Sequence, residues 1–501
     1  MSFLGWMIDL AREQSACEVV LSGWLRRAAA AGYNAIGLYL EHRYAYPSAP
    51  WAAGPGCLTP ELARQLQQTA RAHGLRLIPF LNTLGHMEGF IRSEGGQWLA
   101  EGEPGFGSAQ ICASRAECTA FVRGLIADAL EAFDDEWVHL GGDETNQLGQ
   151  CPRCAERVRQ IGKGGLYAEY FAPLCRFVLE RGRRPCLWGD MLLLHPEALD
   201  ALPRETLIFD WQYFGRPRPS TELFRGRGFD VVCCPSVQTY NSGWCFLGET
   251  QRNIDEHAED ARACGALGVL VTTWEYCWFT QYRATLPVIL AAGRRLARRE
   301  DWTAALTAEG GAGYTAAAEL LGNEIPAVSR FLKAGTWRQL RDRLVIRQNP
   351  FWLWKDWRDE ACGATGDAVL ELADRADRML SPEEPLRFAV DLHRIAVQWV
   401  RAVEEAYQAY RRRDREQCVR VLQEAKAILS RLRPGLLLAR AEGGSDADVR
   451  RLGLLLEKVD RAGARVSGTG PLGVALPGFE TLLHDAYVAG DQAGWRCGSY
   501  Y

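Results

Sequence analysis

The chain has 501 residues, of which 48% are apolar and 24% are charged, which is the composition of an ordinary globular protein. Its 58 Lys and Arg residues nearly balance its 62 Asp and Glu residues, and the net charge of -4 provides no field that would attract nucleic acid or an anionic membrane. No signal peptide and no bilayer-spanning apolar run is evident, so we expect a cytoplasmic protein with a compact, neutral ligand.

Short apolar segments recur along the first 300 residues, and loops with helix-spaced stretches separate them. We expect helices at residues 17–31, from the cap at Thr59 to Gly74, and at 114–133. The eight expected strands are residues 5–11, 35–41, 75–81, 136–142, 185–190, 206–212, 230–236 and 268–274.

Strands that are apolar along their whole length must be covered on both faces, as in a closed parallel (β/α)8 barrel. A doubly wound open sheet is the main alternative. We favour the barrel because no Gly-rich phosphate loop follows the first strand, and because polar or aromatic residues follow nearly every strand. In a barrel those residues converge on one mouth, where such enzymes keep their chemistry. They are Asp9 and Arg12, Glu41, Asn82 and His86, Asp143 and Glu144, Trp188 and Asp190, Asp210 and Trp211, and Trp274 and Glu275.

The strand pattern stops near residue 300, so we divide the chain into a catalytic barrel, residues 1–300, and a mainly α-helical region, residues 301–501. Helical spacing marks residues 364–381, 386–412 and 414–431. The aromatic segment 351–357 is expected to pack against the barrel wall. Closure over the mouth, or a subunit contact in a homodimer, are its alternatives.

The sixteen cysteines are scattered, and several fall inside expected strands, which favours buried free thiols over disulfides. Cys151 and Cys154 form a Cys-Pro-Arg-Cys pair, which is half of a zinc-site pattern. Cys112 and Cys118 could in principle supply two further ligands. We nevertheless expect two ordinary thiols, with no metal and no other cofactor.

The segment Trp137–Thr145 reads as a strand that ends in two glycines and two adjacent carboxylates, Asp143 and Glu144. Such a pair is often a solvated acidic turn. At a frayed strand end, however, both carboxylates can turn toward one cleft and serve acid and base chemistry.

The run His139-Leu-Gly-Gly-Asp-Glu144 resembles the H-x-G-G-D-E motif of family 20 glycoside hydrolases, the β-N-acetylhexosaminidases. Met7–Arg12 is similar to the first-strand segment of that family, and Ile78–His86 to its third-strand segment ending in Gly-His. The resemblance extends over roughly residues 5–300. It implies a carbohydrate substrate with a terminal N-acetylhexosamine, and no nucleic acid or membrane partner.

The resemblance also implies roles for individual residues. Asp143 and Glu144 become the catalytic pair, Arg12 the clamp on the 3- and 4-hydroxyls, and Tyr240 the donor to the acetamido oxygen. The full set of implied substrate-binding residues is Arg12, Glu41, His86, Trp188, Trp211, Tyr240, Trp274 and Glu275. From the residues alone, His139 could equally be a core histidine. The tryptophans as plain core and Arg12 as a surface charge are the less favoured alternatives.

Three features depart from the family pattern. The chain begins almost at its first strand, whereas most members carry a small β-domain before the barrel. Glu41-His-Arg stands where many members have paired aspartates, and Glu275 follows Trp274 directly where others have one residue between. These features indicate a barrel-only subgroup or a neighbouring family with the same mechanism.

The expected function is that of an exo-acting retaining β-N-acetylhexosaminidase with substrate-assisted catalysis through an oxazolinium intermediate. A 2-acetamido sugar carries its own nucleophile, so one acid and one orienting carboxylate suffice. The alternatives are a non-catalytic sugar-binding barrel and another acetamido-sugar hydrolase, including one selective for N-acetylgalactosamine.

Overall fold

The structure is a computed structural model that describes residues 2–11, 17–105, 107–239, 243–274, 282–329, 355–441 and 447–467. Its contacts form two compact units. One comprises Met1–Val237, Thr250–Trp274 and Ile289–Ala305, and the other Gln238–Glu249, Glu275–Val288 and Leu306–Tyr501. Two segments that precede residue 300 thus group with the second unit, and the sequence-based boundary at residue 300 stays a prediction.

The strands of the first unit form a closed parallel barrel, which confirms the (β/α)8 expectation over the open sheet. All eight predicted strands are present. They are β1 (Phe3–Asp9), β2 (Ala35–Tyr39), β3 (Arg76–Phe80), β4 (Trp137–His139), β5 (Arg184–Trp188), β6 (Leu207–Trp211), β7 (Asp230–Cys234) and β9 (Gly268–Thr273). Strand β9 closes the barrel by pairing with β1, and a two-residue strand, β8 (Ser236–Val237), extends beside β9.

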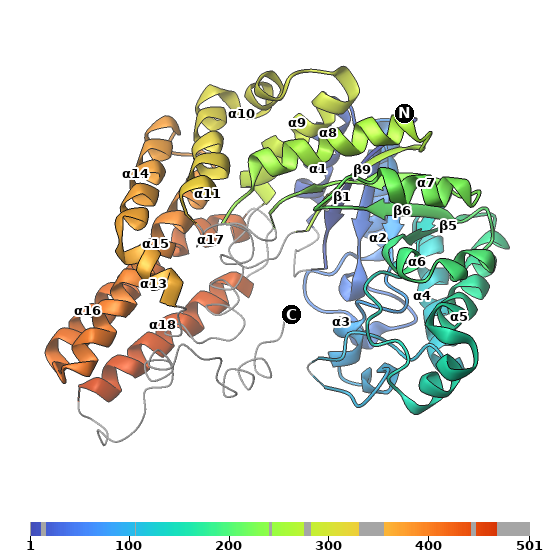
Figure 1. The fold of residues 1–501 in the computed structure, drawn as a ribbon, viewed down its shortest axis with the longest axis horizontal. Coiled ribbons are helices and arrows are strands. Elements are labelled where there is room, and N and C mark those ends of the chain that lie inside the picture. Colours follow the sequence, from blue (N-terminus) through green and yellow to red (C-terminus); the bar gives the residue numbers. More distant parts are fainter. Residues whose placement is uncertain are drawn as a thin grey trace. The chain divides into compact units, whose positions relative to one another are not determined.

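Helices cover the outside of this barrel, with α2 packed against β3, α5 against β5 and α7 against β7 (Figure 1). They are α1 (Glu18–Ala31), α2 (Pro60–Ala72), α4 (Ala116–Ala132), α5 (Pro152–Leu179), α7 (Arg218–Gly226), α8 (Leu247–Ala263) and α9 (Tyr282–Arg298), with the short α3 (Glu88–Arg92) and α6 (Asp190–Leu194) in loops. Thr59 caps α2 as predicted, since its hydroxyl accepts from Leu62 N at 3.2 Å.

The barrel interior is unusually rich in aromatic rings. Phe80 stacks on His139 with centroids 4.4 Å apart, and Trp188 lies 4.4 Å from the same imidazole. Phe209 meets His139 edge-on at 4.9 Å. These rings fill the space that shorter residues occupy in other barrels, and they form a rigid floor under the carboxyl ends of the strands.

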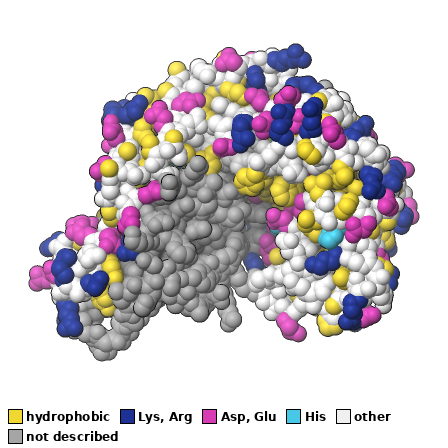
Figure 2. All heavy atoms as spheres, in the orientation of Figure 1, with side chains coloured by type: hydrophobic (Ala, Val, Ile, Leu, Met, Phe, Trp, Pro, Cys, Tyr) yellow, Lys and Arg dark blue, Asp and Glu magenta, His cyan; other side chains and the backbone are white. Residues whose placement is uncertain are grey.

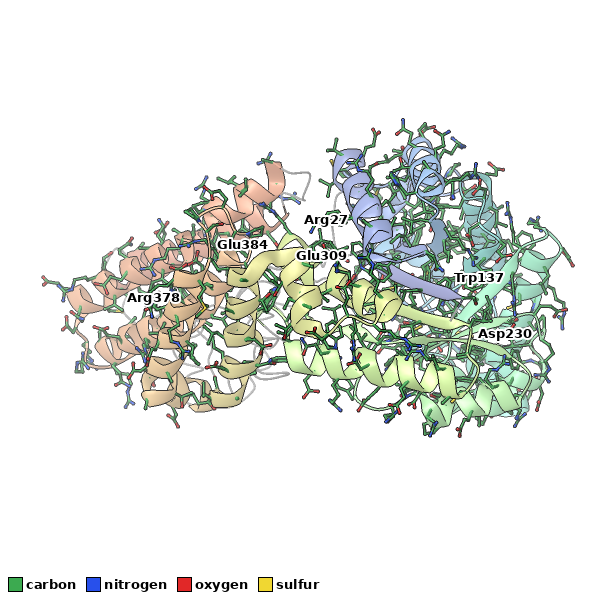
Figure 3. All side chains as sticks on the ribbon, turned by 90° about the horizontal axis from the view of Figure 1, so that it is seen from above. Arg27, Trp137, Asp230, Glu309, Arg378 and Glu384 are labelled. Atoms are coloured by element: carbon green, nitrogen blue, oxygen red, sulfur yellow. The ribbon has the colours of Figure 1, made fainter. Side chains whose placement is uncertain are left out.

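Ion pairs line the opposite end, where the strands begin. Arg76 lies over the Trp137 ring at 4.0 Å and pairs with Asp135 at 2.6 Å. Asp230 accepts from Arg184 at 2.8 Å and from Arg225 at 2.6 Å. Trp137 and Asp230 mark this end in Figure 3. Opposite charges are therefore matched where the barrel strands start.

The second unit is mainly helical, as predicted. Helices α14, α15, α16 and α18 pack in sequence order, and Trp399 of α15 is completely buried. The helices of this region are α10 (Trp302–Glu319), α11 (Ile325–Val328), α13 (Lys355–Cys362), α14 (Ala364–Met379), α15 (Arg387–Arg411), α16 (Arg415–Ser430), α17 (Arg433–Ala441) and α18 (Ala447–Val466). The side chains of the aromatic segment 351–357 lie outside the described residues.

Basic and acidic side chains are interspersed on the described part of the face drawn in Figure 2. Within the described ranges, no helix combines the length and the apolar character that crossing a membrane requires. Every cysteine that the structure describes has a free thiol, in line with the sequence-based expectation.

Candidate active site

The carboxylates Asp143 and Glu144 follow β4 at the carboxyl end of the barrel. Gly141 and Gly142 have φ values of 74° and 92°, and these left-handed conformations end the strand three residues before its predicted end. A Cβ at Gly142 would lie 2.5 Å from the Tyr167 hydroxyl, which donates to the Gly142 carbonyl at 2.9 Å. Only glycine therefore fits this turn, and the turn fixes the position of both carboxylates.

His86 bridges the two carboxylates. Its Nε2 lies 3.3 Å from Asp143 Oδ2 and 3.4 Å from Glu144 Oε2. Burial disfavours the charged imidazolium, but the Asp143 charge and the hydrogen bonds to both carboxylates outweigh burial, so the pKa of His86 is raised well above its usual value. The structure thus brings three predicted site residues into direct contact.

Asp190 adds a third carboxylate that was noticed at a strand end but was not among the predicted site residues. Its Oδ2 accepts from the Glu144 backbone N at 2.9 Å, which ties the loop after β5 to the turn after β4. Burial and the nearby Asp143 charge raise the pKa of Asp190 to about 7. A carboxyl group that titrates near neutrality is typical of reaction centres.

Several buried polar atoms at this mouth have no hydrogen-bond partner among the residues that the structure describes. They are Asn82 Oδ1, Asp143 Oδ1, Trp188 Nε1 and Asp190 Oδ1. Buried polar groups are normally paired, and leaving one unpaired costs about 1 to 3 kcal/mol. Their gathering at the carboxyl ends of β3, β4 and β5 is what a site for a polar ligand requires.

Backbone strain concentrates at the same place. Glu41, His86 and Glu144 have φ values of 43°, 53° and 47°, although each carries a bulky side chain. These residues follow β2, β3 and β4, three neighbouring strands of the barrel. Non-glycine residues in the left-handed region are found where the surrounding structure holds them for function.

Glu41 lies next to His86 beneath the surface. It is 1% exposed, and single side-chain atoms of Glu41, His86 and Glu88 lie within 4.8 Å of one another. The residue belongs to a short 3-10 helix, Glu41–Arg43, rather than to the end of the predicted strand. The structure therefore places Glu41 in the carboxylate cluster around His86.

The predicted tryptophans occupy two levels of the barrel. Trp188 is 0% exposed and belongs to the aromatic floor together with His139, whose pKa burial lowers well below its usual value. The structure thus shows His139 as a core histidine, one of the interpretations that the sequence left open. Trp211 and Trp274 lie at the carboxyl ends of β6 and β9, where they pack against this core and are only partly buried.

Tyr213 connects these two upper tryptophans, and sequence reasoning missed it. Its ring packs on Trp211 at 5.0 Å, and its hydroxyl accepts from Trp274 Nε1 at 2.7 Å. Its position two residues past a strand end was the available signal. Arg12, Tyr240 and Glu275 lie outside the described residues, and their roles stay predictions.

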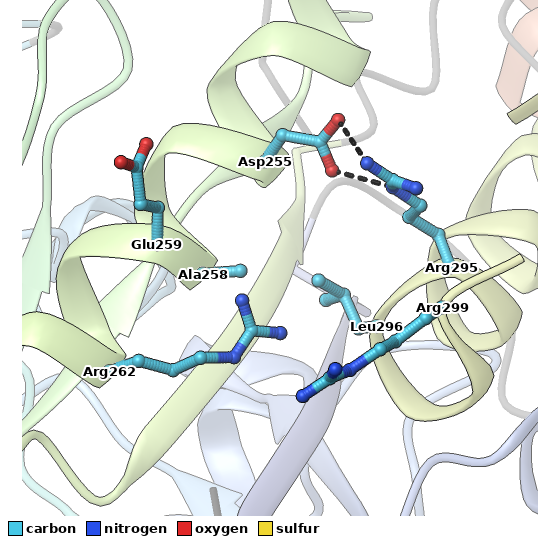
Figure 4. Close-up of a pocket in the computed structure, with 7 residues that line it drawn as sticks. All are labelled: Asp255, Ala258, Glu259, Arg262, Arg295, Leu296 and Arg299. Carbon is cyan, nitrogen blue, oxygen red and sulfur yellow. Dashed lines mark hydrogen bonds and ion pairs between the residues drawn. The ribbon is translucent and has the colours of Figure 1, made fainter. Parts of the chain in front are cut away.

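A separate pocket of about 470 Å3 lies between α8 and α9 on the outside of the barrel (Figure 4). Arg295 pairs there with Asp255 at 2.9 Å, and Arg262 and Arg299 also line it. It contains none of the strand-end carboxylates, so the candidate active site is the barrel mouth.

Residues 33–263 match the family model described as the catalytic domain of glycosyl hydrolase family 20. The matched range contains β2 to β7 and the turn carrying Asp143 and Glu144. No curated protein matches the chain.

Solved structures with a similar fold include the family 20 exo-β-N-acetylglucosaminidase of Vibrio harveyi in complex with N-acetylglucosamine, at 17% identity and a TM-score of 0.51, covering 64% of this chain and 58% of that one. The chitobiase of Flavobacterium johnsoniae matches at 14% identity and a TM-score of 0.51, over 99% of this chain and 78% of that one. At these identities the structural matches show the fold alone. This chain spans less than two thirds of the length of the Vibrio enzyme.

Proposed function

We propose that the barrel of this chain, in which residues 33–263 match the family 20 catalytic-domain model, belongs to that family, and that the protein is an exo-acting retaining β-N-acetylhexosaminidase. It removes terminal, non-reducing β-linked N-acetylglucosamine or N-acetylgalactosamine. One observation carries the proposal: Asp143 and Glu144 stand side by side at the barrel mouth, on a turn that only glycines can form, with His86 in contact with both.

In the proposed reaction the acetamido oxygen of the substrate attacks the anomeric carbon while the glycosidic C–O bond breaks. Glu144 gives its proton to the departing oxygen. A water molecule then attacks the anomeric carbon of the oxazolinium intermediate, Glu144 takes up the proton of that water, and the C–O bond to the acetamido group breaks. Two inversions give net retention.

The different exposure of the two carboxylates supports this division of roles. The Glu144 side chain is 54% exposed, as an acid that meets a departing group at the mouth must be. The Asp143 side chain is 8% exposed, which suits a carboxylate that accepts the acetamide N–H inside the barrel and stabilises the positive charge of the intermediate. His86 holds both in position.

The upper aromatic residues supply the contact surface for the sugar. The partly buried Trp211 and Trp274 offer ring faces to the apolar face of a pyranose, while Tyr213 fixes their orientation. Trp188 supports them from the floor, 6.2 Å from Trp274. The clamp role of Arg12 stays part of the proposal.

Aryl β-glycosides of glucose, N-acetylglucosamine and N-acetylgalactosamine test the function directly. We expect hydrolysis of one or both acetamido sugars and much slower hydrolysis of the glucoside, because glucose lacks the internal nucleophile. Inactivity toward both acetamido sugars would refute the enzyme proposal and leave a sugar-binding barrel. Equal rates on the glucoside would refute substrate assistance.

A thiazoline fused to the sugar tests the mechanism. Because it mimics the bicyclic intermediate, it should bind at least about 10²-fold more tightly than the free N-acetyl sugar. A 2-fluoro sugar should leave no covalent adduct. A trapped glycosyl ester on any carboxylate, together with weak thiazoline inhibition, would instead establish an enzyme nucleophile.

The cytoplasmic location and the homodimer stay proposals from the sequence. Cell fractionation and light scattering of the purified chain test them.

A further inference from the structure

Three thiols and one carboxylate meet beside the active-site turns. Single ligand atoms of Glu101, Cys112, Cys151 and Cys154 all lie within 4.8 Å of one another. Glu101, Cys112 and Cys154 are buried and Cys151 is partly buried. The pair Cys151 and Cys154 was the half-site seen in the sequence. Of the two cysteines considered as partners for it, the structure brings Cys112 to the pair, whereas the Cys118 thiol contacts the Leu99 carbonyl at 3.7 Å.

The distances match those of a tetrahedral metal site. Cys112 Sγ lies 3.5 Å from Cys151 Sγ and 3.7 Å from Cys154 Sγ, and Cys154 Sγ lies 3.2 Å from Glu101 Oε2. Zinc–sulfur bonds of about 2.3 Å at a tetrahedral angle place two sulfurs about 3.8 Å apart. A disulfide, by contrast, needs sulfurs about 2.05 Å apart. The spacing is that of ligands around an ion.

The backbone fixes each of the four groups. Glu101 and Cys112 lie on two segments joined by an antiparallel bridge between Ala100 and Ile111, with Glu101 N donating to Gln110 O at 2.9 Å. On the other side, Cys151 is the N-cap of α5, and Cys154 N donates to its sulfur at 3.4 Å. The cluster is thus held by a β-bridge and a helix start.

The carboxylate of Glu101 is oriented as a metal ligand would be. Its Oε1 accepts from the backbone N of Gly149 at 3.1 Å and of Cys151 at 3.2 Å. Its Oε2 is left facing the thiol of Cys154. Hydrogen bonds of this kind from surrounding groups hold the ligands of metal sites in place.

We propose that Glu101, Cys112, Cys151 and Cys154 bind one zinc ion. Three soft thiolates with one carboxylate at tetrahedral spacing favour zinc among the common divalent metals. All four positions are filled by protein groups, so the ion has a structural role. A bound Zn2+ with three thiolates and one carboxylate carries the same net charge as a four-cysteine site.

The site joins the two loops that carry the active-site residues. Glu101 and Cys112 belong to the segment between β3 and α4, which also carries His86. Cys151 stands seven residues after Glu144. Gln147 already links the same loops, since its side chain accepts from Ala109 N at 3.0 Å and its backbone N donates to Gln110 Oε1 at 3.1 Å. The ion fixes this junction and with it the His86 contact to Asp143.

The test uses the full chain, purified without a metal-binding tag and dialysed against metal-free buffer. Mass spectrometry of metals should find about one zinc per chain. Titration of the thiols with a mercurial should release that zinc in proportion to three cysteines. Cobalt in place of zinc should give the intense visible absorption of a tetrahedral thiolate site. None of these measurements depends on hydrolase activity or requires a mutation.

Variants then locate the ion. Cys112→Ser and Cys154→Ser should lose at least about nine tenths of the bound zinc and melt at a lower temperature. Cys118→Ser is the matched control, because it removes another buried thiol of the same region and should retain the zinc.

The proposal fails if the folded chain holds no zinc and takes up none from zinc-containing buffer. It fails equally if Cys118→Ser loses as much metal as Cys112→Ser, if the bound metal is iron, or if Cys112 is found in a disulfide with Cys151 or Cys154.

Discussion

At the amino end of the barrel, Arg side chains pair with carboxylates, whereas at the carboxyl end two carboxylates, Asp143 and Glu144, share one histidine, His86. Arg76 pairs with Asp135, and Arg184 with Asp230. At the mouth, burial and the nearby Asp143 charge raise the pKa of Asp190 to about 7. Opposite charges are thus paired at one end of the barrel, and like charges are neighbours at the other.

The difference separates a stabilising end from a working end. Ion pairs at the starts of the strands add modestly to stability. Because these side chains already pair with each other, they offer no unpaired charge to a ligand. Crowded carboxylates, unpaired buried atoms and left-handed Glu41, His86 and Glu144 all cost stability. We infer that these unfavourable features are retained because a bound substrate supplies the hydrogen-bond partners that the site residues lack.

The sharpest way to test this contrast is Glu144→Gln. We expect kcat/KM for substrates with poor leaving groups to fall by roughly 10²- to 10⁴-fold, because no proton can be given to the departing oxygen. Activated aryl glycosides should lose far less. The measurement is kcat/KM on a series of leaving groups, and a loss of the same size across the series would assign the acid to another residue.

Asp143→Asn should lower kcat by roughly 10²-fold whatever the leaving group, because the variant removes a preorganised charge partner of the intermediate. The same series of aryl glycosides measures it. A loss that grew as the leaving group became poorer would mean that Asp143 and Glu144 exchange roles.

Asp190→Asn tests whether the crowded mouth lowers the free energy of unfolding. The pKa of Asp190 is raised from 3.8 to about 7, so between these pH values the folded state binds a proton that the unfolded state has lost. Stability from this group is therefore lost as pH rises from about 4 to 7, on the order of 1 kcal/mol per pH unit. Urea unfolding of both proteins at pH 5 and pH 7 should show a smaller decrease for the variant. Equal decreases would place the titrating group elsewhere.

Asp230→Ala, at the amino end, is the matched counterpart with the smallest effect. It should leave kcat/KM unchanged and lower the free energy of unfolding by about 1 kcal/mol at neutral pH, because two arginines lose their partner. Hydrogen bonds from Arg184 lower the pKa of Asp230, so the difference from wild type should vanish as pH falls below its lowered pKa. A change in kcat/KM would show that the two ends are coupled.

The sequence allowed the barrel to be predicted because its signals are local. Each strand is an apolar run of strand length followed by a polar residue, and every one lies within a few residues of its predicted place. The motif His139–Glu144 located the turn that carries Asp143 and Glu144 for the same reason. The early end of β4 follows from Gly141 and Gly142, whose backbone conformation a strand pattern does not encode.

What the sequence left open depends on contacts between distant segments. Whether Trp188 lies at the surface of the mouth or in its floor depends on the neighbouring rings of β3 and β6. Glu101 reaches Cys154 across 53 positions of the sequence, through a bridge inside a long loop, and no spacing rule points to it. Asp190 and Tyr213 could have been chosen from their places just after strands.

The left-handed conformations at positions 41, 86 and 144 have a consequence for directed evolution of this protein. Glycine adopts such angles without a steric penalty, so glycine at any of the three would relieve strain that the present side chains impose. A selection for thermal stability alone should therefore enrich glycine or asparagine at these positions and yield barrels that are more stable but inactive. Selection for turnover should keep Glu, His and Glu at these positions, even in variants that carry stabilising substitutions at other positions.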